Sequence, residues 1–214
     1  MAVSVFGNPI TNSTLEGRPE FARKKDIQKI DRARAALNSI NSDDKQENSL
    51  QHVEKLKEKL GNTTSVGVVT FGIVSNATGD PVKYVTHHDW LGKIAPPGYP
   101  QVIENGQSGG FLHVAEINVI IPPGSVGAVV YRSQSREVID CDFMLAWNNP
   151  SDSSEKTAYT EVHEVDHFFD WDIIYKKLKA SGSECESQWN EYVSNVRIRK
   201  IGQFSVFEAK LKLN

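Results

Sequence analysis

Five consecutive residues, His163-Glu164-Val165-Asp166-His167, have the types and spacing of the zinc-peptidase motif His-Glu-x-x-His. In that motif two imidazoles on one helical turn bind zinc, and the glutamate polarises a metal-bound water. The chemistry therefore requires a helix. The preceding residues 157–162 are mostly β-branched or aromatic, however, and they favour a strand.

On a strand, His163 and His167 would share a face but sit about 13 Å apart, too far to chelate one ion without a bend. No histidine follows residue 167 to supply a third ligand. We therefore predict two solvent-facing imidazoles, no metal and no cofactor. His163 and His167 remain weak metal candidates, and a zinc-dependent hydrolase that uses this segment remains an alternative function.

A second cluster of polar residues, His87-His88-Asp89, precedes Trp90. Adjacent residues on a strand point to opposite faces, so His87 and His88 are not expected to chelate together. A pair such as His88 with His113 cannot be derived from the sequence. The simpler interpretation makes Asp89 a turn or cap acceptor.

Nucleophilic chemistry finds little support. Cys141 is predicted to face the core between two aspartates, and Cys185 lies between two glutamates, which suppresses thiolate formation in both cases. We predict two free thiols rather than a disulfide. Ser108-Gly109-Gly110 is not a nucleophile elbow, and no Lys-Ser/Thr pair follows these glycines to make a phosphate loop.

Aromatic residues in predicted loops or at strand ends are the better candidates for a ligand site. Trp and Tyr at one end of a sandwich suit a lipid headgroup, a sugar or a partner protein, although they also close the ends of cores. For Trp90 and Tyr99 we weigh the two interpretations equally, whereas Trp147 and Trp189 are expected in the core. The candidate binding residues are His88, Asp89, Trp90, Tyr99 and Trp171.

A basic and aromatic stretch near the C-terminus offers another alternative, a protein that binds RNA or single-stranded nucleic acid in antiviral defence. The patch would combine cations with stacking rings, and it comprises Trp189, Tyr192, Arg197, Arg199 and Lys200. Because the net charge of the whole chain is −3, no general basic field attracts nucleic acid. We expect no strong nucleic-acid partner.

The predicted secondary structure that positions these residues changes from helix to strand near Gly61. Residues 23–60 lack Gly and Pro, and their apolar residues recur with helical period in two runs, Ile27–Ile40 and Leu50–Leu60. We predict an N-terminal helical hairpin over residues 1–61 and a β-sandwich domain over residues 62–214, forming one compact unit.

From Ser65 onward the period is two, and Gly, Pro, Asn and Ser separate many short strands. Residues 139–147 alternate apolar and polar, which predicts a half-buried strand with Ile139 and Cys141 facing the core. The fold class is therefore α+β, mainly β, with an antiparallel sandwich. Further strands are expected at Val82–Thr86, Gly110–Ile121, Val126–Tyr131, Ala158–Val165, Asp172–Leu178, Tyr192–Ile201 and Phe204–Leu213.

Motifs between residues 89 and 132 resemble a known family. These are Asp89-Trp90 with Gly92, Tyr99-Pro100, Asn105-Gly106-Gln107, Phe111-Leu112-His113-Val114 and Gly127–Arg132. They are similar to the plant jasmonate-induced proteins of the 23 kDa type, which are related to nakanori, a fungal lipid-binding protein with an actinoporin-like β-sandwich. The resemblance implies the same sandwich here, and a non-enzymatic stress or defence protein that binds a lipid headgroup or a glycan.

The N-terminal helices raise the question of pore formation, since an amphipathic N-terminal segment of actinoporin-like proteins can enter a bilayer. Charged residues crowd the first helix here, and each would cost at least about 2.5 kcal/mol in hydrocarbon. We predict that the helix stays docked by its Ile/Leu face. The chain has no apolar run that could span a membrane and no secretory signal after Met1, which predicts a cytoplasmic protein and leaves the nucleus and an oligomer open.

Overall fold

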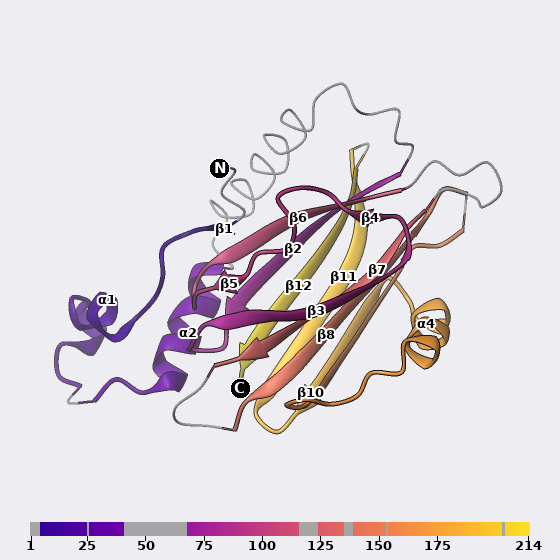
Figure 1. Ribbon diagram of the computed structural model, residues 1–214. Coiled ribbons are helices and arrows are strands. Elements are labelled where there is room, and N and C mark those ends of the chain that lie inside the picture. The colour runs from indigo at the N-terminus through magenta and orange to yellow at the C-terminus, as the bar shows by residue number, and fades with distance from the viewer. Residues whose placement is uncertain are drawn as a thin grey trace.

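The computed structural model describes residues 5–24, 26–40, 68–115, 124–134, 139–152, 154–202 and 204–214. Two β-sheets pack face to face, as the predicted sandwich requires (Figure 1). The strands are β1 (Val5–Phe6), β2 (Val69–Ala77), β3 (Val82–Leu91), β4 (Lys93–Ile94), β5 (Val102–Ile103), β6 (Ser108–Val114), β7 (Gly124–Ser133), β8 (Cys141–Pro150), β9 (Thr157–Glu164), β10 (Glu184–Trp189), β11 (Tyr192–Ile201) and β12 (Phe204–Leu213).

The first sheet has the order β1-β6-β2-β12-β11-β10, with β4 also paired to β6, and the second has the order β5-β3-β7-β8-β9. The described pairings are antiparallel except for β12 with β2, which run parallel. The alternation in the sequence could not show this exception, because a strand buried on both faces has the same pattern in either direction. The core between the sheets is built on Phe111, Tyr131, Phe143, Trp147 and Phe207.

The helices of the described residues occupy two separate regions. The helix α1 (Asn12–Glu16), the 3₁₀ turn η1 (Pro19–Phe21) and α2 (Lys29–Ile40) lie at one end, and α4 (Trp171–Ala180) lies against the outside of the second sheet (Figure 1). The first predicted helix corresponds to α2. The second predicted helix, its end at Gly61 and the start of the strand at Ser65 lie outside the described residues, as does the end of the strand predicted over Gly110–Ile121.

Helix α2 is docked by both apolar and ionic contacts. Its Ala33 joins the core between the sheets, and Ala36 and Ile40 pack in a cluster with Ala77 of β2. Lys29 as a whole residue is only 2% exposed, and its ammonium lies 3.0 Å from a carboxylate oxygen of Asp80 and donates to the Tyr192 hydroxyl. The predicted docking of the first helix is therefore observed.

The strand predicted over Asp172–Leu178 is wrong, because this segment is helix α4. Its start is fixed by Asp170, whose carboxylate accepts hydrogen bonds from the backbone of Asp172 and Ile173. Ile174 and Leu178, four residues apart, lie on one face and are buried against the sheet. Burying each side chain contributes about 1.5–3 kcal/mol, which stabilises the helix against the sheet.

The predicted half-buried strand over residues 139–147 also differs from the observed strand β8. Cys141 faces the core as predicted, but Ile139 lies outside the strand and is 70% exposed. The strand is not half-buried, because Met144 and Ala146 on its second face are covered by α4. Asp142 on that face is buried as well, and a bidentate ion pair with Arg132 compensates its charge.

Candidate functional site

Three of the five predicted binding residues come together on the outside of the second sheet. His88 stacks on Trp171 with ring centroids 5.0 Å apart, and Trp90 lies 6.2 Å from Trp171 and stacks on Tyr175 at 5.3 Å. Phe169 extends the group, 5.9 Å from Trp171. We call these five residues, His88, Trp90, Phe169, Trp171 and Tyr175, the aromatic surface.

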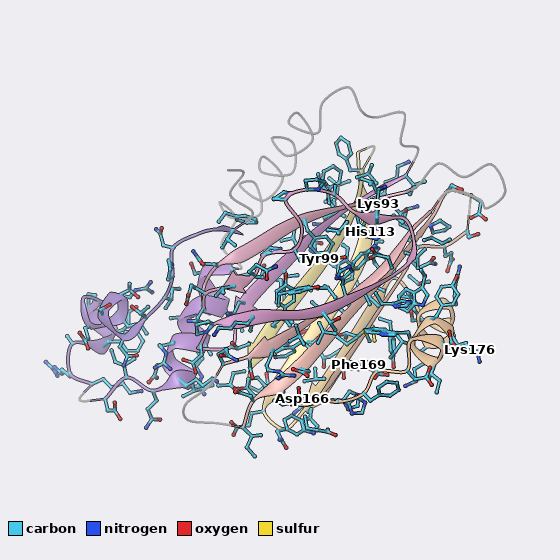
Figure 2. The ribbon with its side chains drawn as sticks, in the orientation of Figure 1. Lys93, Tyr99, His113, Asp166, Phe169 and Lys176 are labelled. Atoms are coloured by element: carbon cyan, nitrogen blue, oxygen red, sulfur yellow. The ribbon has the colours of Figure 1, made fainter. Side chains whose placement is uncertain are left out.

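Two elements that are distant in the chain build this surface. His88 and Trp90 on β3 meet with ring centroids 5.0 Å apart, while Trp171 and Tyr175 are one turn apart on α4. The Asp170 cap sets where α4 begins and hence where Trp171 lies. In Figure 2, Phe169 lies between α4 and the sheet, and Lys176 lies on the outer side of the helix.

Two large apolar side chains of the segment that carries Phe169, Trp171 and Tyr175 remain in solvent. Phe168, beside Phe169, is 84% exposed, and Ile173 on the outer side of α4 is 48% exposed. Within the aromatic surface, the indole nitrogen of Trp90 is buried without a hydrogen-bond partner among the described residues. This part of the molecule thus presents apolar groups and a few polar edges to an apolar or amphipathic ligand.

The other two predicted binding residues do not join the aromatic surface: Tyr99 is in the interior, and Asp89, partly buried, points to His113. Tyr99 is buried, stacks on Tyr84 at 5.8 Å and meets Phe111 edge-on at 4.9 Å (its position is labelled in Figure 2). Burial raises the pKa of the Tyr99 hydroxyl above its usual range. Of the two interpretations weighed for Tyr99, closure of the core is the one that the structure supports.

Asp89 forms a network that resembles a hydrolase triad. Its carboxylate lies 3.1 Å from Nε2 of His113, and Nδ1 of His113 lies 2.9 Å from the hydroxyl of Ser125. His113 and Ser125 have no exposed surface, and the Ser125 hydroxyl donates to Thr70. A substrate cannot reach a buried hydroxyl whose proton is already engaged, so the network joins the two sheets rather than performing acyl transfer.

Side chains pack closely around His113, and this packing explains why a glycine occupies position 127, within one of the motifs. A Cβ atom on Gly127 would lie 2.9 Å from Cζ2 of Trp147 and 3.3 Å from Nε2 of His113. Sequence reasoning missed this network, because its members come from strands that the pairing alone brings together. His113 partners Asp89 rather than His88, the pair that the sequence left open.

The His163–His167 segment departs from the predicted geometry. β9 ends at Glu164, and the chain turns at Asp166, which has a left-handed φ of 64°. Aspartate tolerates this conformation better than most residues. The turn brings the two imidazoles together, stacked with centroids 3.8 Å apart and planes at 6°. The separation of about 13 Å was wrong because it assumed a strand that continued through residue 167.

This geometry also differs from that of a zinc peptidase. The imidazoles come from a strand and a turn instead of one helical face. His163, Glu164 and His167 nevertheless offer ligand atoms that all lie within 4.8 Å of one another. Among the described residues, these three form the one group of at least three His, Cys, Asp or Glu side chains whose ligand atoms lie this close together.

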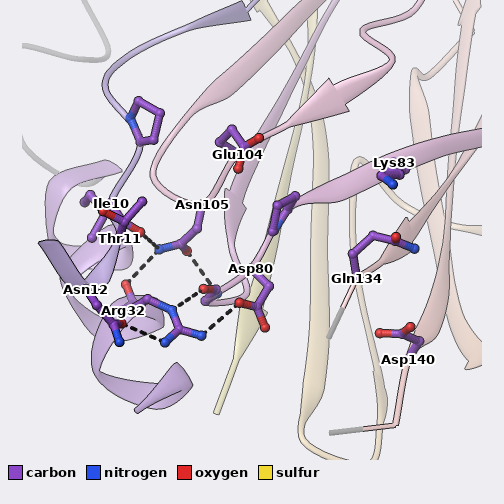
Figure 3. A pocket seen from close by; sticks show the side chains of 13 residues that line it. Ile10, Thr11, Asn12, Arg32, Asp80, Lys83, Glu104, Asn105, Gln134 and Asp140 are labelled. Carbon is purple, nitrogen blue, oxygen red and sulfur yellow. Dashed lines mark hydrogen bonds and ion pairs between the residues drawn. The ribbon is translucent and has the colours of Figure 1, made fainter. Parts of the chain in front are cut away.

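A cavity of about 550 Å³ lies elsewhere, between the N-terminal segment and the turn after β2 (Figure 3). Arg32 on its wall donates to Asn12, Gly79 and Asp80, and Asn105 donates to the backbone of Ile10 and Arg32. These polar groups already have partners within the protein. The cavity wall therefore fastens the N-terminal segment to the sandwich, and none of the predicted site residues lines it.

The basic and aromatic patch predicted near the C-terminus is not assembled. Tyr192 is buried in the core and offers no stacking face, and Trp189 is partly buried against the core. Arg197 and Arg199 both pair with Glu208, which reduces the local positive charge. This arrangement removes the observation that favoured single-stranded nucleic acid.

Both cysteines are free, as predicted. Cys141 is buried, and burial raises the pKa of its thiol above the ordinary value. Cys185 is half-buried on β10. Among the described residues, no helix combines the length and hydrophobicity needed to cross a membrane.

The sequence of this chain is similar to a known protein family and to two jasmonate-induced proteins of plants. The family model described as Nakanori-like protein matches residues 6–211. The chain is 36% identical over 203 residues to the 23 kDa jasmonate-induced protein of Hordeum vulgare, covering 92% of each. It is 29% identical over 140 residues to a jasmonate-induced protein homolog of Atriplex canescens, covering 62% of this chain and 74% of that protein.

The fold comparison agrees with the sequence. The crystal structure of the lipid binding protein Nakanori matches with a TM-score of 0.83 and 22% identity, covering 97% of this chain and 99% of that chain. The resemblance to jasmonate-induced proteins and the sandwich architecture are thus confirmed, and the chain belongs to the Nakanori-like protein family.

Proposed function

We propose that this chain is a non-enzymatic stress protein that binds a membrane lipid through the aromatic surface, with Phe168 and Ile173 entering the lipid layer. The observation that carries the proposal is the exposure of Phe168, just before α4, and of Ile173 within it, on the segment that also contributes half-buried Trp171 and Tyr175 to the aromatic surface. Tryptophan and tyrosine favour the boundary between headgroups and acyl chains, while exposed Phe and Ile gain free energy in the acyl region.

The family supports this proposal from two directions. Nakanori, whose fold covers nearly the whole of this chain, is a lipid binding protein. The sequence relatives are named for induction by jasmonate, which supports a role in plant stress or defence. The buried Asp89-His113-Ser125 network gives no accessible nucleophile to support hydrolysis.

The size of the membrane contribution follows from exposure. Complete burial of a Phe or Ile side chain contributes about 1.5–3 kcal/mol. Scaling by the exposed fractions of 84% and 48% gives about 2–4 kcal/mol for Phe168 and Ile173 together. Every 1.4 kcal/mol corresponds to a factor of ten, so removing both side chains should weaken vesicle binding about 30-fold or more.

The test is flotation of the full chain with vesicles of neutral lipid, with and without sphingolipid. The variant carries Phe168→Ser and Ile173→Ser together. The matched control is Val102→Ser on β5, because Val102 is also exposed, at 38%, but lies on the opposite edge strand of the same sheet. We expect the double variant to lose binding and the control to retain it. Equal binding by all three proteins would refute the proposal.

A glycan array probed with the same three proteins separates a lipid from a sugar ligand. Binding to a defined glycan that survives the double substitution, without vesicle binding by the unmodified chain, would replace the lipid by a sugar. Dependence on sphingolipid would identify the headgroup class. The role of Trp90 is tested separately by Trp90→Phe, because the chain has four tryptophans. Vesicles should shift the tryptophan fluorescence to shorter wavelength, and the shift should be smaller in this variant.

A further inference from the structure

The stacked imidazoles of His163 and His167 occupy a turn that the fold holds in place. The backbone N–H of Asp166 donates to Asp142 at 3.0 Å, and the Asp166 carboxylate accepts from Arg132 at 2.7 Å. Asp142 is itself buried beside Arg132. The return of the chain that places His167 over His163 is therefore anchored to the second sheet.

We propose that His163, Glu164 and His167 form a binding site for one divalent transition-metal ion of the type that favours imidazole, with Zn²⁺ as the representative. Their potential ligand atoms lie within 4.8 Å of one another. Bond lengths of about 2.0–2.1 Å place neighbouring ligands of a tetrahedral ion about 3.3 Å apart. The three groups need to close by no more than about 1.5 Å. The parallel imidazole planes must also tilt, so that a lone pair of each ring points at the same ion. Rotation of the partly exposed side chains supplies both movements.

Hydrogen bonding already selects which nitrogen of His163 faces the ion. Nε2 of His163 lies 3.0 Å from the Glu161 carboxylate, which leaves Nδ1 for a metal. A carboxylate behind a ligating imidazole fixes the tautomer and raises the basicity of the ligand, as is common in metal sites. Glu161 therefore acts as a positioning residue.

Glu161 is well suited to that role because it is itself held. Tyr159 and Lys177 each donate to one of its carboxylate oxygens at 2.7 Å. These contacts hold the carboxylate in a fixed orientation behind His163.

The exposure of the three side chains and the negative charge around them also suit a metal cation. The side chains of His163 and His167 are each 30% exposed and that of Glu164 is 60% exposed, so an ion can enter from solvent. Glu164 and the nearby Asp166 make the turn acidic. Three protein ligands leave a position for water, and we expect micromolar affinity rather than the tighter binding of a closed four-ligand site.

The proposal concerns binding alone. In a zinc peptidase the central glutamate acts on water and two imidazoles come from one helical turn. Here Glu164 is a ligand, and the imidazoles come from a strand end and a turn. The proposal does not depend on lipid binding.

The experiment uses the full chain without a histidine tag, freed of metal by EDTA and dialysis. Zn²⁺ is titrated calorimetrically, and Co²⁺ is titrated by visible absorption, where the d–d bands report the ligands. The variants are His163→Ala, His167→Ala and Glu161→Gln. Two controls are His87→Ala, another partly exposed histidine, and Cys185→Ser, which removes the accessible thiol.

We expect one equivalent of Zn²⁺ to bind to the unmodified chain and to both controls. Each histidine variant should weaken binding at least about tenfold, and Glu161→Gln about 10- to 100-fold, the usual range for a group behind a ligand. A Co²⁺ spectrum without a thiolate charge-transfer band agrees with nitrogen and oxygen ligands. Circular dichroism and thermal unfolding of each variant establish that it is folded.

Two outcomes would overturn the site. One is the absence of Zn²⁺ binding to the unmodified chain at millimolar concentration. The other is binding that His163→Ala and His167→Ala leave unchanged, or that Cys185→Ser alone abolishes. If a histidine variant does not fold, the folded Glu161→Gln protein decides, because a merely structural Glu161 would change stability without changing Zn²⁺ affinity.

Discussion

Replacing Asp80 by Asn should destabilise the protein through two buried cations. Asp80 pairs with Lys29 at 3.0 Å and with Arg32 at 2.8 Å, and the side chains of these partners are only 3% and 11% exposed. Removing one member of a buried ion pair costs about 3–5 kcal/mol, because the remaining charge is left without compensation in a medium of low dielectric.

Two features reduce this figure for Asp80→Asn. The asparagine oxygen still accepts one hydrogen bond, worth about 1 kcal/mol. Lys29 also keeps the Tyr192 hydroxyl, and Arg32 keeps the carbonyl of Gly79 and the side chain of Asn12. The expected loss in the free energy of unfolding is therefore about 2–4 kcal/mol.

Urea unfolding followed by tryptophan fluorescence and circular dichroism measures this loss as a lower midpoint at an unchanged slope. Glu155→Gln is the control, since it removes one acidic charge from an exposed position. In a cycle with Lys29→Met, the two substitutions should be non-additive by more than about 1 kcal/mol. A loss below about 0.5 kcal/mol for Asp80→Asn, the range of ordinary surface substitutions, would refute the argument that this carboxylate holds α2.

Three other predictions concern packing, acid and pore formation. Gly72→Ala should lower the free energy of unfolding by about 1–3 kcal/mol or more through overpacking, because a Cβ atom there would lie 2.0 Å from Cζ of Phe111. The control is Gly182→Ala, which should be nearly neutral in the same unfolding assay because a Cβ atom there would meet nothing within 4 Å. Burial would raise the pKa of Glu208, but Arg199 and Arg197 outweigh burial and lower the pKa below its usual value. The stability that ionised Glu208 contributes is therefore present above pH 4.5 and is lost as the pH falls through the lowered pKa. Between about pH 6 and pH 3, Glu208→Gln should accordingly lose less free energy of unfolding than the unmodified chain. Finally, sphingolipid vesicles should release no dye at micromolar protein, since α2 is held by Lys29 and Arg32; rapid leakage that deletion of residues 1–60 abolishes would contradict this.

Strands with a regular pattern and a clear turn on each side were predictable from the sequence. Tyr192–Ile201 and Phe204–Leu213 were predicted with the bounds that β11 and β12 have in the structure. Glycine and polar residues mark the turn between them, and alternate side chains such as Val196 and Ile198 fill the core. Local information is sufficient in such cases because the turn and the period fix the same register.

Ion pairs and turns were less accessible to sequence reasoning. The alternation in β8 places Asp142 on the polar face, but its partner Arg132 lies ten residues earlier on β7, and only the pairing of the two strands brings them together. The return at Asp166 depends on the same contacts, since Asp142 and Arg132 both bind that residue. A distance between His163 and His167 based on a continued strand therefore could not be corrected without the tertiary structure.

Helix α4 connects the main error in the fold to the part of the site that was found. Trp171 and Trp90 were selected because aromatic residues stood in predicted loops, not because any pattern placed them together. The sequence does contain the missing signal, since Asp170 precedes a helical repeat in which Trp171 with Tyr175 and Ile174 with Leu178 are each four residues apart. β-branched Ile173 and Ile174 beside Tyr175 also suit a strand, and that propensity prevailed in the prediction. Had the cap been given more weight, one face of the helix would have been assigned to the sheet through Ile174 and Leu178. Trp171 and Tyr175 would then lie beside that face and Ile173 outside it, which is the arrangement on which the proposed membrane contact depends.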